Sequence, residues 1–340
     1  MKRTLKTLAG GLAVLGMAGL ATQAQAKDFY KMSTLGPGST PYVVMSTFAK
    51  IVNTNVKDTE IQVNATGVAT RHALDAARGK IDFFMSAESL NHFMKNGLAM
   101  YKKVKDAPKL FANLRSIVNF PIGSYHIMAF ADSGINSMKD IKGKKVFVGP
   151  PAGAAKVIAT AMVEAMSGLK SGKDFTAVKL GWSAAAQAFQ DRQLDVYINP
   201  TNAPSPVISQ IALTNKVRFF GLSEANFKVP AIAKQMKLPG RSREQIDPKV
   251  YGKNAVNTKP VTSIASWVGI GSHKGVNADA VYKMTKAFWS NLDEVHAVAP
   301  WLKIIQMKSA FNHMTAPLHP GAAKYYKEAG AEIPAHLMAK

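Results

Sequence analysis

The chain has 340 residues, 47% of them hydrophobic, and carries 43 basic against 21 acidic residues for a net charge of +22. It contains no cysteine, which excludes disulfides and thiolate metal sites. An excess of basic residues this large favours an anionic small molecule or an anionic membrane surface as partner, although a basic surface that only aids solubility is the alternative.

The first 26 residues have the pattern of an export signal. Three basic residues precede an apolar run from Leu8 to Ala21, and the sequence Ala24-Gln25-Ala26 follows as a cleavage pattern. The run is shorter than the roughly 20 residues that cross a bilayer, so a retained membrane anchor is the weaker alternative. We expect a signal peptide at 1–26 and a soluble mature chain in the periplasm. Its removal leaves 40 basic and 21 acidic residues, a net charge of +19, and export argues against a nucleic-acid partner.

Strand-like segments alternate with helical ones along the mature chain, which predicts an α/β fold with parallel sheets. The first part predicts strands at 28–35, 60–66 and 80–89, with helices at 43–53 and 69–78. The middle predicts strands at 125–131, 144–151, 175–181 and 194–200, with helices at 154–166 and 184–190. The last part predicts a strand at 265–272 and helices at 278–291 and 292–300.

Four turns place small, hydroxyl or amide residues where a predicted strand gives way to a helix: Gly36–Thr40, Thr66–Thr70, Pro150–Ala155 and Asn199–Asn202. Helix N-termini carry unpaired N–H donors and a partial positive charge. Ligand crevices of open α/β sheets lie at the carboxyl ends of the strands. We therefore expect these turns to converge on a cleft that binds an anion.

Nucleotide binding and catalysis find no support in the motifs. The turns lack the Lys-Ser/Thr of a phosphate loop and the three-glycine spacing of a dinucleotide site, and neither H-E-x-x-H nor G-x-S-x-G occurs. His72 and His92 are not spaced as helical metal ligands. Glu88 is a conceivable general base, but no nucleophile lies near it in sequence. The prediction is a protein without catalytic, cofactor or metal site.

Two runs, "DIKGKKVFVGPP" and "PLHPGAAKYY", occur in this order along the chain. Together with the four turns they resemble the extracytoplasmic solute receptors of TRAP transporters, specifically the TAXI family, and the resemblance covers almost the whole mature chain. It implies a two-lobed, class II periplasmic binding fold that closes over a small organic anion. Known ligands of the family lean toward glutamate, glutamine and related dicarboxylates, which the receptor delivers to a cation-driven membrane permease.

The implied fold divides the chain into lobe I, roughly residues 27–120 and 265–340, and lobe II, roughly 121–264. Two strands, Tyr125 to Ala131 and Ala265 to Gly271, are expected to cross between the lobes as the hinge. The receptor is expected to act as a monomer and not as an enzyme.

The chain departs from the pattern of the TAXI family at turns that face the ligand. Where the family reads T-G-G-S followed by Asn, this chain reads Thr66-Gly67-Val68-Ala69 with His72. The family's Gln-Ser-Asp is Ala87-Glu88-Ser89, and its G-P-P-G-S-G-T loop is Gly149 to Ala155 without either hydroxyl. The lost side-chain donors put a glutamate pocket in doubt, while backbone donors for an anion remain.

Arg71 is expected to compensate for the lost donors, because a guanidinium grips a carboxylate or sulfonate with two parallel hydrogen bonds. The alternative is a solvated arginine on the outer face of its helix. Glu88 would repel a second negative charge or receive an ammonium or hydroxyl group, and Tyr42 and Trp267 are candidate walls of the pocket. The predicted ligand-binding set is Gly38, Ser39, Thr40, Tyr42, Thr66, Ala69, Thr70, Arg71, Ser86, Glu88, Gly153, Ala154, Ala155, Asn199 and Asn202.

Three alternatives stay open at the level of the sequence. The first keeps the fold and serves an ABC importer of sulfonates or similar anions. The second is a secreted enzyme on the same fold. The third is a signalling receptor whose closed form is presented to a membrane sensor.

Overall fold

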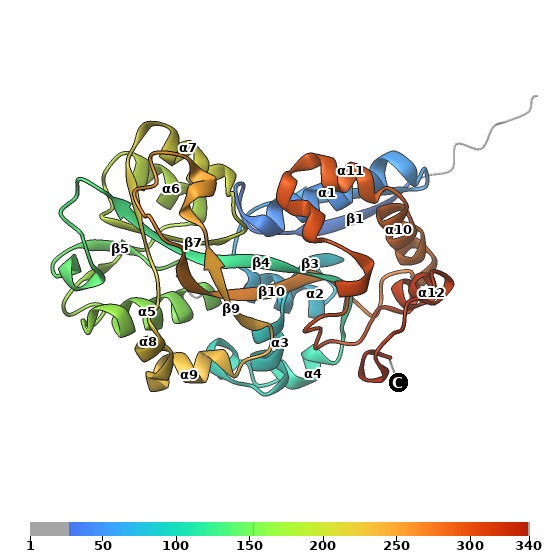
Figure 1. The fold of residues 1–340 in the computed structure, drawn as a ribbon. Helices are drawn as coiled ribbons and strands as arrows, with labels where there is room; N and C mark the ends of the chain where they lie inside the picture. Colours follow the sequence, from blue (N-terminus) through green and yellow to red (C-terminus); the bar gives the residue numbers. More distant parts are fainter. Residues whose placement is uncertain (1–26, 152, 339–340) are drawn as a thin grey trace, which may run out of the picture.

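The computed structural model describes residues 27–151 and 153–338, so the predicted signal peptide lies outside the described residues. The chain forms two lobes, and two long strands run from one to the other (Figure 1). One ten-stranded sheet has the order β2-β1-β3-β10-β4-β7-β5-β6, while β8 pairs with β4 and β9 with β10. The predicted two-lobed α/β fold is confirmed.

Lobe I is the half that contains the first three strands. β1 (Asp28–Ser33) pairs in parallel with β2 (Thr59–Asn64) and with β3 (Phe83–Ala87). The helices of this lobe are α1 (Thr40–Asn55), α2 (Ala69–Ala77), α3 (Glu88–Lys95), α4 (Ala107–Phe111), α10 (Ala278–Ser290), α11 (Leu292–Val298) and α12 (Pro320–Glu328). Strands and helices alternate up to β3 as the sequence predicts, whereas α3 and α4 were not predicted. Helices α10 to α12 return to this lobe from the C-terminal part of the chain.

Lobe II is built from β5 (Lys145–Phe147), β6 (Thr176–Ala177), β7 (Val196–Thr201) and β8 (Val217–Phe220). Its helices are α5 (Ala154–Ser167), α6 (Trp182–Gln190), α7 (Pro206–Thr214), α8 (Glu224–Lys228) and α9 (Pro230–Met236). Three predictions differ from the structure here. The strand expected at 144–151 covers only Lys145–Phe147, and the strand expected at 175–181 is only two residues long. The helix expected from residue 184 begins at Trp182, because Gly181 in extended conformation serves as its N-cap.

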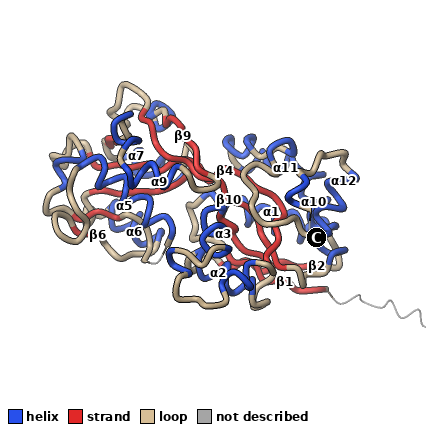
Figure 2. Tube along the Cα trace, turned by 90° about the horizontal axis from the view of Figure 1, so that it is seen from below, coloured by secondary structure: helices blue, strands red, loops and turns tan. Residues whose placement is uncertain are grey.

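Two antiparallel strands carry the connection between the lobes: β4 (Leu114–Phe130) and β10 (Val261–His273). Both are longer than predicted. A third strand, β9 (Arg241–Ile246), pairs with the first half of β10, from Val261 to Ser266, and was not predicted because its sequence RSREQI lacks apolar alternation. The view from below shows β4, β9 and β10 together at the narrowing between the lobes (Figure 2).

Each lobe has its own hydrophobic core. In lobe I the larger cluster includes Ile122 of β4 and Val268 of β10, whereas the neighbouring cluster in lobe II includes Tyr125 and Ile264 of the same strands. The two strands therefore leave one core and enter the other within three or four residues. The limits of the lobes in sequence, near residues 121 and 264, stay a prediction.

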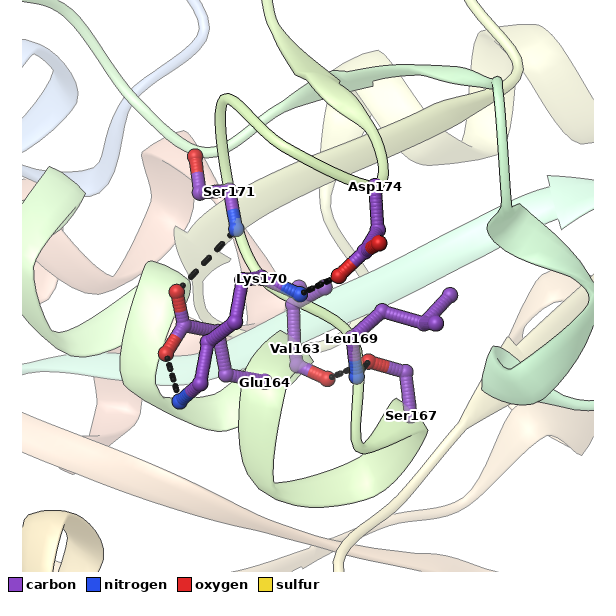
Figure 3. A network of polar contacts seen from close by, with 7 residues as sticks. All are labelled: Val163, Glu164, Ser167, Leu169, Lys170, Ser171 and Asp174. Atoms are coloured by element: carbon purple, nitrogen blue, oxygen red, sulfur yellow. Dashed lines mark hydrogen bonds and ion pairs between the residues drawn. The ribbon is translucent and has the colours of Figure 1, made fainter.

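The C-terminal end of α5 is anchored by a local network of polar contacts (Figure 3). The Ser167 hydroxyl donates to the Val163 carbonyl at 2.7 Å and accepts from the Leu169 amide at 3.0 Å. Lys170 Nζ donates to Glu164 Oε2 at 2.9 Å. These contacts tie the segment that follows α5 to the last turn of the helix, at the end of α5 that is remote from the cleft.

Candidate functional site

A cavity with an empty volume of ≈ 590 Å³ lies between the two lobes. Lobe I contributes Leu35, Met85 and Leu90 to its wall, and lobe II contributes Pro150 and Pro200. Most of its lining is apolar, as is usual for small-molecule sites. Because both lobes line it, a molecule held there contacts both at once.

Four helices begin at this cavity, and their first residues or N-caps line it. The lining residues are Val68 and Ala69 at α2, Ala87 at α3, Gly153 and Ala154 at α5, and Trp182 at α6. At none of these four helix starts does the side chain of the N-cap residue accept a hydrogen bond from a backbone amide of the first turn. The positive ends of four helix dipoles therefore gather around one space, which favours a negative charge within it.

One cationic side chain, Arg241, faces this cavity among the described residues. One terminal nitrogen of its guanidinium donates to the hydroxyl of Ser266, and the other donates to Ser89 Oγ at 3.3 Å. Its Nε is buried and has no hydrogen-bond partner. The described residues offer Arg241 no acidic partner, so its positive charge is left for a ligand.

Tyr125 completes this polar corner of the cavity. It is 3% exposed, and burial raises the pKa of its hydroxyl, while the neighbouring Arg241 and Ser266 act in the opposite direction. At neutral pH the group is therefore a neutral phenol. Arg241, Tyr125 and the hydroxyls of Ser89 and Ser266 form a set of donors that suits the oxygens of a carboxylate or sulfonate.

Two tryptophans form walls of the cavity. Trp182 stands edge-on to Phe147, with ring centroids 5.4 Å apart, and it packs against the cores of both lobes. Trp267, a predicted wall residue, lies 5.3 Å from the ring of His313, and its backbone amide donates to the Gly240 carbonyl at 2.8 Å. Indoles on two sides provide flat apolar surface for the body of a ligand.

Four of the predicted ligand-binding residues line this cavity: Ala69, Gly153, Ala154 and Ala155. They come from the turns at 66–70 and 150–155, which the structure brings together. A second groove, with an empty volume of ≈ 720 Å³, continues outward from the cavity and shares Val68, Pro150 and Trp182 with it. Thr66 lines this outer groove and not the inner cavity.

The other two predicted turns meet each other instead of the cavity. Thr40 Oγ1 accepts from the backbone amide of Asn202 at 3.2 Å and from its side-chain amide at 3.4 Å. Gly38, with φ of +84°, packs so closely on Val207 of lobe II that a Cβ would lie 2.3 Å from it. Ser39 caps α1 by accepting from the Tyr42 amide at 3.3 Å. These residues join the lobes and do not line the ligand space.

Further predicted site residues serve the structure of their own lobe. Asn199 is buried in β7 opposite His126 of β4. Ser86 accepts a hydrogen bond from Asn91, and the Thr70 carbonyl accepts one from the Tyr101 hydroxyl at 3.1 Å. None of these predicted residues, nor Tyr42, lines the cavity.

Arg71 is not at the cavity. Its side chain is 67% exposed, and its Nε lies 2.7 Å from Asp75 one helical turn later. The sequence placed it correctly in the first turn of α2 but did not reveal which face of the helix it occupies. The solvated arginine, the alternative reading of the sequence, describes its surroundings.

Glu88 lies behind the cavity wall and is fully buried. Its Oε1 accepts from Asn119 Nδ2 at 2.9 Å, and its Oε2 accepts from the Thr315 amide at 2.8 Å and from the Thr315 hydroxyl. Burial raises the pKa of this carboxyl to about 7, although these hydrogen bonds favour the charged form. Glu88 holds the loop around Thr315 and is not among the residues that line the cavity.

The predicted ligand-binding set omitted Arg241, Tyr125, Trp182 and Ser266. It also omitted Ser89, although the resemblance places the turn of Ser89 at the ligand. Trp182 could have been predicted from the sequence, because it directly follows Gly181 at a strand-to-helix junction like the four predicted turns. Arg241 follows Pro239-Gly240 in a polar segment that reads as a loop. Its position depends on the pairing of β9 with β10, a contact that no local pattern announces.

Across the described residues no cluster of three or more His, Asp or Glu side chains has the arrangement of a metal site. The helices of the described chain are all too short or too polar to cross a membrane.

Residues 32–330 match the model of the NMT1-like family. Similar solved structures include a TRAP periplasmic solute binding protein from Shewanella oneidensis with bound succinate, at 12% identity and a TM-score of 0.47 over 89% of this chain and 92% of that one. Another is the counterpart from a Sulfitobacter species with bound β-D-galacturonate, at 12% identity and a TM-score of 0.46 over 90% and 88%. A third is the aliphatic sulphonate binding protein SsuA of Escherichia coli, at 13% identity and a TM-score of 0.41 over 92% and 91%.

Proposed function

The chain belongs to the NMT1-like family, and we propose that it is a periplasmic solute-binding receptor that captures a small organic anion between its lobes. The observation that carries the proposal is the guanidinium of Arg241, a cation without an acidic partner, at a cavity that both lobes line. We further propose that it delivers the anion to the membrane permease of a TAXI-type TRAP transporter, as the sequence resemblance implies.

Ligand capture follows from the way the two lobes meet. Ala69 of lobe I and Ala154 of lobe II line the same cavity, so separating the lobes pulls its walls apart. A ligand that contacts both walls binds only the closed form completely and shifts the equilibrium toward it. Closure then distinguishes the loaded receptor from the empty one for the permease.

The proposed periplasmic location is supported by the export pattern in residues 1–26. It also agrees with the absence of cysteine, since the described fold gains its stability from the apolar cores of its lobes.

A receptor for an ABC importer of sulfonates is the second candidate. It is favoured by the same donor set, because the guanidinium and hydroxyls at Arg241, Ser89 and Ser266 suit sulfonate oxygens as well as carboxylate oxygens. The neighbouring gene discriminates between the two systems. A large permease without an ATPase supports the TRAP assignment, whereas an ATPase gene supports the importer.

A thermal-shift screen of carboxylates, amino acids and sulfonates tests the proposed function. A ligand that binds only the folded chain raises its melting temperature by mass action, by an amount that grows with ligand concentration. We expect at least one organic anion to do so. The absence of any shift across the panel would contradict the proposal.

A further inference from the structure

Resting on the proposed function, we infer that the ligand is a monoanion with an apolar, ring-sized body, and that it carries neither an ammonium group nor a second carboxylate. The inference rests on one cation, Arg241, which lies at one corner of the cavity. The other walls of the cavity are formed by apolar side chains and two indoles.

The charge of the wall sets the charge of the ligand. Arg241 is the one charged side chain lining the cavity within the described part of the chain, which includes neither a second cation nor an acid there. Its two hydroxyl neighbours, Ser89 and Ser266, are 5% and 7% exposed, so the guanidinium is held by buried groups rather than by solvent. One guanidinium pairs with one oxyanion, and the described lining residues include no second cationic side chain to pair with another carboxylate.

The rest of the wall favours an apolar body. Met85, Leu90, Ile122 and Val268 of lobe I face the cavity, as do the indoles of Trp182 and Trp267. Each apolar Å² that a ligand buries against this surface is favourable by roughly 25 cal/mol. A charged group pressed against the same surface loses its hydration without gaining a hydrogen bond, which is strongly unfavourable.

The first residues of the helices point to the same ligand. At the starts of α2, α3 and α5 the lining positions include Ala69, Ala87, Ala154 and Ala155, whose side chains carry no hydrogen-bonding group. Methyl groups at these junctions leave the backbone amides as the donors around the anion and remove the side-chain partners that a second polar group on the ligand needs.

An ammonium group also lacks an acceptor. Glu88 is the nearest acid in sequence to the α3 junction, but its two oxygens are taken by Asn119 and Thr315. Gly240 also covers it from the side of β9, so closely that a Cβ there would lie 3.0 Å from Glu88 Cβ. The ammonium group that the sequence analysis expected Glu88 to receive therefore has no counter-ion among the described residues that line this cavity.

The test compares ligands that differ by one group. Benzoate, phenylacetate and 3-phenylpropanoate are titrated calorimetrically into the mature full-length protein. Hexanoate tests whether the body of the ligand must be a ring, and benzenesulfonate tests whether a sulfonate can replace the carboxylate. 3-Phenylpropanoate is then compared with phenylalanine, which adds an ammonium, with benzylsuccinate, which adds a carboxylate, and with 3-phenylpropanamide, which removes the charge. Glutamate and succinate complete the panel.

We expect the tightest aryl monoanion, carboxylate or sulfonate, to bind at least ~100-fold more tightly than the compounds with an added charge, which is the scale of burying an unpaired charge. Glutamate or succinate binding within tenfold of the best monoanion, or more tightly, would overturn the inference and leave the receptor function standing. Failure of every compound in the panel to bind would overturn both. The amide binding as tightly as the carboxylate would also overturn the inference, because it would show that Arg241 does not select charge.

Discussion

Arg241 Nη2 donates to Ser89 Oγ across 3.3 Å, which joins the first residue of β9 to the first turn of α3. The two residues are 152 positions apart in the chain and meet at the corner of the interlobe cavity. Because Ser89 and Ser266 already hold the guanidinium, a ligand does not have to order this side chain on binding. A preorganised cation of this kind gains affinity by reducing the entropic cost of association.

Replacing this cation should remove most of the affinity for an organic anion. We expect Arg241→Met to weaken binding of the tightest anion from the thermal-shift screen by roughly 2–5 kcal/mol, the scale for truncating one partner of a buried charge pair. Arg241→Lys should recover only part of the loss, because an ammonium lacks the planar fork of a guanidinium. Isothermal titration calorimetry measures the affinity of the parent and of both variants for the anion.

Arg243→Met is the matched control for charge. It removes the same charge from the same strand, but Arg243 is paired with Glu224 at 3.0 Å and lies over the ring of Phe227, away from the cavity. Its affinity should stay within twofold of the parent. Equal losses in both variants would show that overall charge attracts the ligand, and would remove Arg241 from the site.

Ala154→Leu should abolish ligand binding while leaving the fold intact. A leucine side chain at position 154 would occupy the cavity where α5 begins. It would also push the start of α5 away from the core cluster of lobe I on which Ala154 packs. The melting temperature should no longer respond to the anion, whereas circular dichroism should match the parent. Val157→Leu, at an exposed position of the same helix, is the control that should bind normally. Retained affinity in Ala154→Leu would exclude this turn from the site.

Glu88 should make the protein less stable as the pH rises. Burial raises the pKa of its carboxyl to about 7 from the ordinary 4.5, so the folded state binds this proton more tightly than the unfolded chain does. The stabilisation is complete below the unfolded pKa and is lost as the pH rises through the folded one. We expect a loss on the order of 1–3 kcal/mol in the free energy of unfolding.

The comparison of parent and Glu88→Gln isolates this contribution from other titrating groups. His126 and His319, whose pKa values burial lowers to about 4, act with the opposite sign at lower pH and are unchanged in the variant. Urea unfolding from about pH 5 to about pH 8 should show the difference between the two proteins shrinking as the pH rises. A constant difference across that range would show that Glu88 does not titrate there.

The contact between Thr40 and Asn202 should stabilise the junction of the lobes. Thr40→Val leaves the buried backbone amide of Asn202 without its acceptor, whereas the side-chain amide keeps the Pro121 carbonyl at 3.0 Å. Leaving one buried donor unsatisfied costs about 1–3 kcal/mol. Urea denaturation should show this loss, and Thr40→Ser, which retains the hydroxyl, should restore most of it. Parent-like stability of the valine variant would mean that water replaces the contact.

The sequence predicted the parts of the fold that depend on local pattern. The alternation of strands and helices, the apolar strands and the small-residue turns near Ala69 and Ala154 are all properties of neighbouring residues. Both turns do line the cavity, because each follows a parallel strand whose carboxyl end faces the other lobe. The two-lobed α/β architecture could be predicted for the same reason.

The parts that could not be predicted depend on contacts between distant segments. The turns at Gly38 and Asn202 look locally like the other two, but close packing of Gly38 on Val207 makes them part of the junction of the lobes. Arg71 and Arg241 are both arginines near a turn. Only the pairing of β9 with β10 decides that Arg241, and not Arg71, faces the ligand space.

A crystal structure of the protein with its tightest bound anion would locate the ligand relative to Arg241. We expect the anionic head to lie within hydrogen-bonding distance of the Arg241 guanidinium and the Ser89 hydroxyl, with the body of the ligand between Trp182 and Trp267. An anion bound outside the interlobe cavity, with Arg241 contacting only its serine neighbours, would contradict this expectation.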